Sequence, residues 1–425
     1  IFRVSGPDAS LALWAIRCDN LPPPRRAVRS RLRDPTTGET IDEALCLWFP
    51  SPSSMTGEDL AEFHVHGGHA VSAGLAAALQ QIEGIGPAEP GEFTRRAFEN
   101  GKLDLTEAEA IADLVNAETA AQRRQALHQL DGNLGQLYDS WSGNLTRALA
   151  HVEAHFDFAD EFLPTDLIVG AKAQITSVLG AMSAHLDDDG RGERIRNGIR
   201  IAIVGPPNVG KSSLLNALAG REAAIVAETA GTTRDVIEVY LDLGGFAVVV
   251  ADTAGLREAE DAIEREGVRR ARARAEDADI VIAMLDATAG EPEKHIERKL
   301  LGENAVVAIN KIDLRRPKSP LEIAGHQAME ISVTTGEGIE RLIETTRNRI
   351  AERFAVGETP ILTRARHRTA LEECVAALRG AETSALPELM AEDLRLAVRA
   401  LGRITGSVGV EDILDIVFAE FCIGK

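Results

Sequence analysis

The segment from Arg200 to Ser213 constrains this chain more than any other. A β-branched run, Ile201 to Val204, is followed by the spacing G-x-x-x-x-G-K-S and then by a helical pattern. The sequence therefore predicts strand, loop and helix in that order. In such a loop, backbone N–H groups and the helix N-terminus hold nucleotide phosphates, while Lys211 adds a positive charge and Ser212 a Mg²⁺ ligand. We expect the chain to bind a nucleoside triphosphate, and a plain glycine turn is the weaker alternative.

Further motifs complete a guanine nucleotide site. The phosphate loop supplies Asn208, Val209, Gly210, Lys211, Ser212 and Ser213, and the later contacts are expected from Gly231-Thr232-Thr233, Asp252-Thr253-Ala254-Gly255, Asn310-Lys311-Ile312-Asp313 and Ser332-Val333-Thr334. The Thr233 hydroxyl is suited to Mg²⁺ and the γ-phosphate, Asp252 to supporting the metal, and the Gly255 N–H to contacting the γ-phosphate. The Asp313 carboxylate can accept from the ring N–H and the exocyclic amine that guanine has and adenine lacks. The order predicts a Ras-like GTPase domain that binds GTP.

One expected group is absent from this set. Leu256 follows Asp252-Thr253-Ala254-Gly255, where Ras-like enzymes place the glutamine that orients the attacking water. An apolar side chain cannot orient water. Either hydrolysis is weak or another polar group substitutes, and Glu258, Glu260, Glu264 and Glu266 all follow closely.

The first 118 residues predict an α+β domain. Strand-like runs occur at Phe2–Val4, Ala44–Phe49 and Glu62–Val65, separated by glycine turns. His64 and His66 would share a strand face, but no acidic or cysteine ligand stands at matching spacing, so a metal site is the weaker interpretation. The segment Pro90–Leu105 brings cations and carboxylates together and is a candidate for holding a small anion.

The next segment predicts helices on both sides of the nucleotide-binding region. From Thr106, with Glu109 as its capping-box partner, apolar residues recur every three or four positions to about Phe158, which predicts a long helix or helix pair. A second helix is expected near Ala171–Leu186, and helical periodicity returns beyond Glu352. We predict a helical domain in two halves, 119–195 and 353–425, that pack on each other around an inserted domain, 196–352.

Composition excludes some classes of protein. The formal charge of −20 argues against broad electrostatic binding of nucleic acid, and the basic stretches at 25–33, 265–274 and 364–368 are each more typical of a solvated helix or loop face. Cys18, Cys46, Cys374 and Cys422 form no C-x-x-C pair, so neither a disulfide framework nor a zinc site is indicated. We identify no apolar run of about 18 residues and no signal peptide, so we expect a cytoplasmic protein with no membrane segment.

These motifs, together with Cys422-Ile423-Gly424-Lys425 and the segment Pro90–Leu105, resemble the MnmE (TrmE) family of tRNA modification GTPases over the whole chain. The resemblance implies a multidomain α/β fold with an N-terminal folate-binding domain (1–118), a discontinuous helical domain and an inserted GTPase domain. It also implies a homodimer and a reaction shared with an FAD-dependent MnmG-type partner. In that reaction, a one-carbon unit from tetrahydrofolate, as the 5,10-methylene or 5-formyl derivative, and an amine from glycine or ammonium modify the wobble uridine of certain tRNAs.

The same resemblance implies site residues. A K⁺ ion would stand in for an arginine finger, held by the side chains of Asn208 and Thr232 and by carbonyl groups of Ala227 and Thr229 in the loop Ala227-Glu228-Thr229-Ala230. Glu264 matches the glutamate that orients water, and Cys422 the terminal cysteine needed for modification. Arg3, Glu62, Lys102 and Lys425 match the folate-contacting positions.

A rival interpretation comes from another class of protein. Gly406-Ser407-Val408-Gly409 has the GxxG spacing of a KH loop, so a GTP-switched, RNA-binding ribosome-assembly factor without modification chemistry is the alternative. Its surroundings are helical and acidic, whereas a KH loop is flanked by basic residues. Tight folate binding by residues 1–118 separates the two interpretations, because an assembly factor has no use for folate.

Overall fold

The computed structural model describes residues 1–157, 167–221, 223–224, 238–251, 273–317, 319, 321–355, 357, 359–408, 414, 417–418 and 421. The chain forms two compact units, each with hydrophobic clusters of its own. The first unit combines Ile1–Ala112, Gln129–Leu179 and Ala370–Lys425; the second combines Asp113–His128 and Gly180–Thr369.

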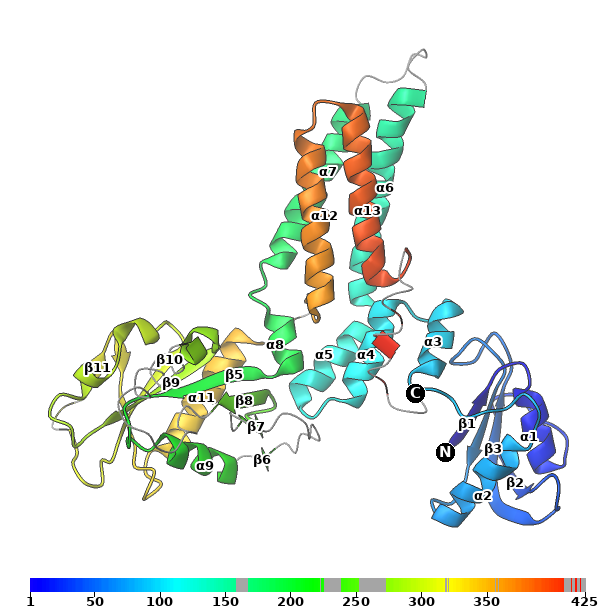
Figure 1. Cartoon of the computed structure of the whole chain (residues 1–425), viewed down its shortest axis with the longest axis horizontal. Coiled ribbons are helices and arrows are strands. Elements are labelled where there is room, and N and C mark those ends of the chain that lie inside the picture. The colour runs from blue at the N-terminus through cyan, green and yellow to red at the C-terminus, as the bar shows by residue number, and fades with distance from the viewer. Residues whose placement is uncertain are drawn as a thin grey trace, which may run out of the picture. The chain divides into compact units, whose positions relative to one another are not determined.

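The first unit begins with a four-stranded antiparallel sheet in the order β1-β4-β3-β2. Strands β1, β2 and β3 are labelled in Figure 1. Its strands are β1 (Phe2–Ser5), β2 (Val28–Arg33), β3 (Thr40–Phe49) and β4 (Leu60–His64). Helices α1 (Ala9–Arg17) and α2 (His69–Gln80) pack on the face that carries the apolar residues of each alternating strand. The three predicted strands are confirmed, and β3 and β4 begin earlier than expected.

The basic stretch 25–33 was expected to be a solvated helix or loop face, and this prediction is wrong for residues 28–33, which form strand β2. Ser30 and Leu32 alternate with Arg29 and Arg31, so every second residue faces the core or its margin. Arg29 and Arg31 each bind Glu43 on the neighbouring strand. The alternation is that of a half-buried strand, and the run of arginines obscured it.

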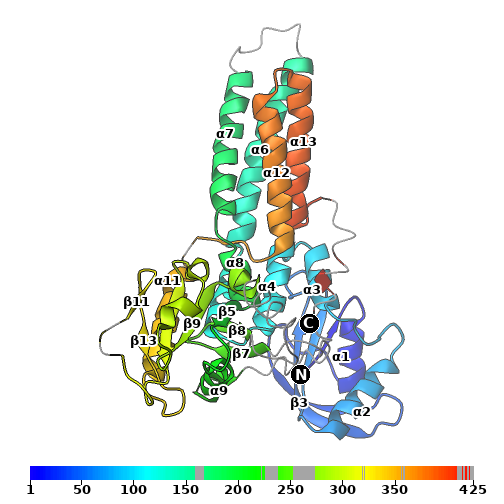
Figure 2. The same cartoon turned by 60° about the vertical axis from the view of Figure 1, so that its left-hand side comes forward.

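Helices from before and after the nucleotide-binding segment pack together in the first unit. Both views show α6, α7, α12 and α13 side by side (Figures 1 and 2). Lys172 Nζ donates to the Ser384 carbonyl oxygen at 3.3 Å, and Arg395 binds Glu153 at 2.8 Å. The helices of this region are α6 (Asn133–Asp157), α7 (Leu167–Leu186), α12 (Ala365–Thr383) and α13 (Pro387–Thr405).

The predicted long helix from Thr106 is divided into α4 (Leu105–Val115), α5 (Ala120–Leu130) and α6. Its capping box lies two residues earlier than we expected. The backbone N–H of Glu107 donates to Asp104 Oδ1 at 2.8 Å, and the N–H of Asp104 donates to Glu107 Oε2 at 2.7 Å. The reciprocal pair is therefore Asp104 with Glu107, not Thr106 with Glu109. Aspartate caps helices as well as threonine does, so the spacing D-x-x-E carried the signal.

One apolar stretch contradicts the expectation that no run is long enough to span a bilayer. Residues Leu167–Asn197, which include α7, reach a mean hydropathy of 1.3 over 18 residues. Length and composition alone are weak support for a membrane span, since core helices pass the same test. In α7, Ile175 and Met182 are fully buried and the Thr176 hydroxyl donates to Glu382 at 2.6 Å.

The second unit is organised around a seven-stranded sheet in the order β13-β10-β9-β5-β8-β7-β6. The parallel core consists of β5 (Ile199–Val204), β8 (Ala247–Ala251), β9 (Ile280–Asp286), β10 (Ala305–Asn310) and β13 (Met329–Glu330). The pairs β6 (Ala223–Ala224) with β7 (Glu238–Asp242) and β7 with β8 are antiparallel. Helices α8 (Arg191–Asn197), α9 (Lys211–Arg221) and α11 (Ile339–Arg353) complete the α/β arrangement. The strand predicted at Ile201–Val204 is confirmed as part of β5, and its nearly continuous burial fits a parallel strand that is covered on both faces.

Candidate functional site

The phosphate loop lies between β5 and α9, at the carboxyl end of the central strand. Lys211 Nζ donates to the carbonyl oxygens of Gly205 and Pro206, each at 2.9 Å, which holds the side chain across the loop. Gly210 has φ +104°, and a Cβ there would stand 2.6 Å from Asn310 Nδ2. The loop therefore requires glycine at this position both for its backbone angle and for its contact with the base-recognition segment.

Asn310 joins the phosphate loop to the loop after β13. Its Nδ2 donates to the Val209 carbonyl oxygen at 2.8 Å, and its Oδ1 accepts from the Val333 N–H at 3.0 Å. The side chain is only 4% exposed, so its role is to connect segments of the pocket. Asp313 is held separately, because the Ser332 hydroxyl donates to its Oδ1 at 2.6 Å.

Sequence reasoning missed Asp286 at the end of β9. Lys311 Nζ binds its Oδ2 at 2.6 Å, and the Thr288 hydroxyl and backbone N–H both donate to its Oδ1. Burial acts to raise the pKa of Asp286, but these hydrogen bonds prevail and the pKa is lowered. An aspartate at the carboxyl end of a buried parallel strand was the available signal, since ligands bind at that edge of the sheet.

The structure brings one part of the predicted nucleotide site together and leaves another part outside the described residues. Ser213 lies in the first turn of α9, and Thr334 lies in the turn that follows Ser332 and Val333. Outside the described residues lie Ala227, Glu228, Thr229, Ala230, Gly231, Thr232, Thr233, Asp252, Thr253, Ala254, Gly255, Glu264, Cys422 and Lys425.

A second cluster lies on the N-terminal sheet. Arg3 Nε binds Glu62 Oε1 at 2.8 Å across β1 and β4, and His64 Nε2 lies 2.9 Å from Glu62 Oε2. Burial acts to raise the pKa of Glu62, but His64 and Arg3 outweigh it and lower the pKa. Lys102 is not part of this pair: its Cε lies 3.3 Å from where a Cβ on Gly57 would stand. The two histidines contact different carboxylates, because His66 binds Asp42.

A cavity of about 550 Å³ lies beside this cluster. Arg3 lines it from β1, Leu79 from α2, and Glu92 and Arg96 from α3 (Glu92–Glu99). The other lining residues come mainly from the first nine residues of the chain and from the segment between α2 and α3, including Ile85 and Pro87. The volume suits a small organic ligand.

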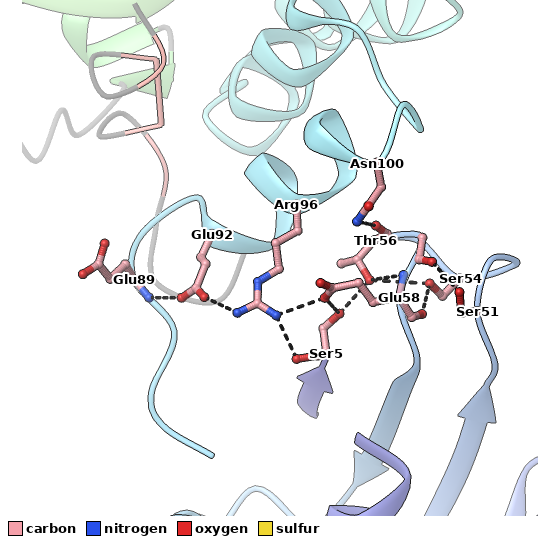
Figure 3. Close-up of polar contacts among 10 residues, drawn as sticks. Ser5, Ser51, Ser54, Thr56, Glu58, Glu89, Glu92, Arg96 and Asn100 are labelled. Atoms are coloured by element: carbon pink, nitrogen blue, oxygen red, sulfur yellow. Dashed lines mark hydrogen bonds and ion pairs between the residues drawn. The ribbon is translucent and has the colours of Figure 1, made fainter. Parts of the chain in front are cut away.

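Arg96 is the centre of the polar contacts in Figure 3. Its Nη1 donates to the Ser5 carbonyl oxygen at 3.1 Å and to Glu58 Oε2 at 3.0 Å, while its Nη2 donates to Glu92 Oε1 at 2.5 Å. In the segment Pro90–Leu105, a candidate for holding a small anion, Arg96 thus binds two carboxylates. Arg96 therefore fixes α3 to β1 and to the loop before β4.

A phosphate-binding loop and an Asn-Lys-x-Asp motif at the carboxyl edge of a mainly parallel sheet define a P-loop GTPase, and the chain is a GTP hydrolase of this class. The family profile described as "MnmE helical domain" matches residues 105–422, and that described as "GTP-binding protein TrmE N-terminus" matches residues 1–102. The chain belongs to the MnmE (TrmE) family of tRNA modification GTPases, so the resemblance stated from sequence and the predicted fold class are confirmed.

Relatives match over the full length of the chain. The tRNA modification GTPase MnmE of Paramagnetospirillum magneticum is 54% identical over 100% of this chain and 96% of its own. The corresponding proteins of Rhodospirillum rubrum and Parvibaculum lavamentivorans are 52% and 53% identical with the same coverage. Among solved structures, the G domain of the T. maritima FeoB iron transporter is 28% identical over 36% of this chain and 98% of that domain, with a TM-score of 0.29.

Proposed function

We propose that this chain is a K⁺-dependent GTPase that acts with an FAD-dependent, MnmG-type partner on tRNA. The pair adds a carboxymethylaminomethyl or aminomethyl group to the wobble uridine, using a one-carbon unit from 5,10-methylene- or 5-formyl-tetrahydrofolate. The observation that carries the proposal is the presence in one chain of a guanine nucleotide site and a TrmE N-terminal domain, with relatives over half identical throughout. We further propose that it works in the cytoplasm as a homodimer.

The domain division that we propose follows the sequence. Residues 1–118 form the folate-binding and dimerisation domain, 119–195 and 353–425 the two halves of the helical domain, and 196–352 the GTPase domain. The packing of α6, α7, α12 and α13 supports a helical domain assembled from both sides of the insertion.

Oxygen groups at and near the phosphate loop are suited to binding Mg²⁺ and K⁺. Ser212 and Thr233 would hold Mg²⁺, which neutralises charge on the β- and γ-phosphates. Asn208 has φ +59° and is exposed at the edge of the loop, so its side-chain oxygen is accessible to K⁺ together with Thr232 and the carbonyl groups of Ala227 and Thr229. Glu264 would orient the attacking water in place of the glutamine that Leu256 replaces.

The one-carbon site would use the Arg3–Glu62 pair with Lys102 and Lys425. A carboxylate whose pKa is lowered stays ionised at neutral pH and can accept hydrogen bonds from the N–H groups of a pterin ring, while the cations suit the carboxylates of the folate tail. The adjacent cavity is large enough for a ring system. Cys422 would act in the modification step.

The rival assembly factor loses its main structural support. Helix α13 ends at Thr405, Gly406 adopts φ +89°, and the N–H groups of Gly406 and Ser407 donate to the Gly402 carbonyl oxygen at 3.0 and 2.9 Å. These are the bonds of a helix C-cap. The backbone of a KH loop contacts RNA, whereas the N–H groups of Gly406 and Ser407 are already hydrogen-bonded to the last turn of α13.

The experiment that tests the proposal measures modified nucleosides. tRNA from cells that lack this gene would be digested, and carboxymethylaminomethyl- and aminomethyl-type uridines quantified, with complementation by wild type and by Cys422→Ser. We expect loss that only wild type restores. Unchanged nucleosides in the deletion strain would reject the modification function and favour the assembly factor.

The K⁺ dependence has its own test. GTP hydrolysis at equal ionic strength is expected to be much faster in K⁺ than in Na⁺, because a cation of the right size stabilises charge that develops in the transition state. Equal rates in the two salts would remove the potassium ion from the mechanism.

A further inference from the structure

The turn that carries Asp313 begins at a residue with an unfavourable backbone conformation. Lys311 has φ +69°, in the left-handed region that residues with a Cβ rarely adopt. The N–H groups of Leu314 and Arg315 donate to the Lys311 carbonyl oxygen at 3.0 and 3.2 Å, so Lys311 sets the direction in which the chain passes Asp313. A residue other than glycine stays in this conformation only where surrounding contacts stabilise it.

The side chain of Lys311 has such a contact in Asp286. Strands β9 and β10 are parallel, and Asp286 lies opposite Asn310 in their register, so Lys311 follows directly after the paired strand ends. Lys311 Nζ binds Asp286 Oδ2 at 2.6 Å, and the two side chains are 29% and 20% exposed. A charged hydrogen bond that is partly sheltered from water is stronger than one at the open surface.

Thr288 fixes Asp286 in turn. Its N–H and its hydroxyl donate to Asp286 Oδ1 at 2.8 and 2.6 Å, and Oδ2 is the oxygen that Lys311 binds. Arg315 Nη1 donates to the Thr288 carbonyl oxygen at 3.4 Å. The loop after β9 therefore contacts both ends of the turn after β10, through the ion pair at its start and through Arg315 at its end.

We propose that Asp286 is a positioning residue for guanine recognition, which acts through Lys311 by stabilising the turn that carries Asp313. The inference rests on the proposed nucleotide site, in which the Asp313 carboxylate accepts from the ring N–H and the exocyclic amine of guanine. Asp286 needs no contact of its own with the base. When its charge is lost, Lys311 loses the contact that offsets its backbone strain, and Asp313 is placed less firmly against the base.

The first test measures the affinities of the full-length protein for GTP and for ITP, whose base lacks the exocyclic amine. Asp286→Asn is expected to lower GTP affinity about 10-fold and the GTP-to-ITP affinity ratio about threefold, because one charged hydrogen bond is lost and the amine contact weakens. The kcat of hydrolysis at saturating GTP should stay within about twofold of wild type, since the turn serves binding of the base in ground state and transition state alike. An unchanged affinity ratio would overturn the proposal.

Asp279, directly before β9, provides the matched control at the opposite end of the same strand. Its side chain is 6% exposed, accepts from the Arg200 N–H at 2.8 Å and binds Arg194 at 3.2 Å. Asp279→Asn should lower the melting temperature and leave the GTP-to-ITP ratio at the wild-type value. An equal change of the ratio in both variants would assign the effect of Asp286 to stability of the sheet and overturn the positioning role.

A double-variant cycle tests whether Asp286 acts through Lys311. Lys311→Met retains the Cβ and a long side chain but cannot bind the carboxylate, so Asp286→Asn should cost almost no further GTP affinity in that background. Additive losses would show that Asp286 acts through another group, which would overturn the proposal. Thr288→Val keeps the Asp286 charge and removes one donor, so it should lower GTP affinity about threefold and retains the test if Asp286→Asn does not fold.

The outcomes distinguish the positioning role from the nucleotide site on which it rests. If Asp313→Asn binds GTP as wild type does, the proposed base recognition and this inference both fail. If Asp313→Asn weakens GTP binding while Asp286→Asn retains the wild-type affinity and GTP-to-ITP ratio, the positioning role is overturned and the nucleotide site stands.

Discussion

The nucleotide site and the N-terminal Arg3–Glu62 cluster are built in opposite ways. At the nucleotide site, short motifs follow the ends of parallel strands, where backbone N–H groups converge and one loop supplies several contacts. In the N-terminal unit, Arg3 meets Glu62 from 59 residues away and Arg96 meets Ser5 from 91 residues away. Motifs a few residues long determine the first kind of site, whereas the second kind forms only when the strands have paired. The two should also fail differently when they are mutated.

The largest effect is expected from removing base recognition. In Asp313→Asn the carboxylate that accepts from two guanine N–H groups is lost, and charged hydrogen bonds are each worth about 1.5–3 kcal/mol. GTP affinity should fall by roughly 10³-fold, as measured by titration with a fluorescent GTP analogue. The N-terminal cluster shares no residue with this site, so the melting temperature of the first unit should not change; a parallel loss there would contradict the independence of the two sites.

The second-largest effect is expected on the rate of GTP hydrolysis. Glu264→Ala is expected to retain GTP affinity and to lower turnover by at least roughly 10²-fold, the scale of a group that positions water. Single-turnover rates with saturating GTP would measure it, with Glu266→Ala as the matched control two residues away. Near-normal turnover would assign the orienting role to another group.

The N-terminal unit should lose stability without losing GTPase activity. Arg96→Ala removes bonds to Ser5, Glu58 and Glu92, and at partial exposure the loss is expected to be about 2 kcal/mol. Arg96→Lys keeps the charge but loses the two-pronged geometry, so it should recover only part of that loss. Chemical denaturation followed by the fluorescence of Trp14, Trp48 and Trp141, which all lie in the first unit, would measure both. An equal loss in the two variants would show that charge contributes nothing.

Acid should weaken the same contacts. Burial acts to raise the pKa of Glu92, but the Glu89 N–H and Arg96 outweigh it and lower the pKa on folding from 4.5. A carboxyl whose folded pKa is lowered contributes stability that is complete above its unfolded pKa and is lost as pH falls through the folded value. We expect the stability of the first unit to decline below about pH 4.5 less steeply in Glu92→Gln than in wild type. Identical pH profiles would exclude Glu92 as a contributor.

The sequence predicted those features that local spacing encodes. The phosphate loop, the strand before it and Asp313 follow from motifs a few residues long, and the family resemblance supplied the rest of the proposed site. Strand β2 was missed because its arginines outweighed the alternation of Ser30 and Leu32. The arrangement of Arg96 between two carboxylates was missed because it depends on strand pairing and on the position of α3, which no spacing in one segment specifies.

The smallest effect tests how much the nucleotide site depends on its supporting contacts. The Ser332 hydroxyl is fully buried, donates to Asp313 at 2.6 Å and accepts from the Thr335 N–H at 3.2 Å. Ser332→Ala removes one donor to a carboxylate that keeps its charge and its contact with guanine, so GTP affinity should fall only about fivefold, the equivalent of about 1 kcal/mol. Nucleotide titration of Ser332→Ala beside Asp313→Asn measures the ratio directly. If Ser332→Ala lost as much GTP affinity as Asp313→Asn, the site would depend on contacts that place its side chains and not on the backbone loop alone. The nucleotide site would then no longer differ in this respect from the N-terminal cluster.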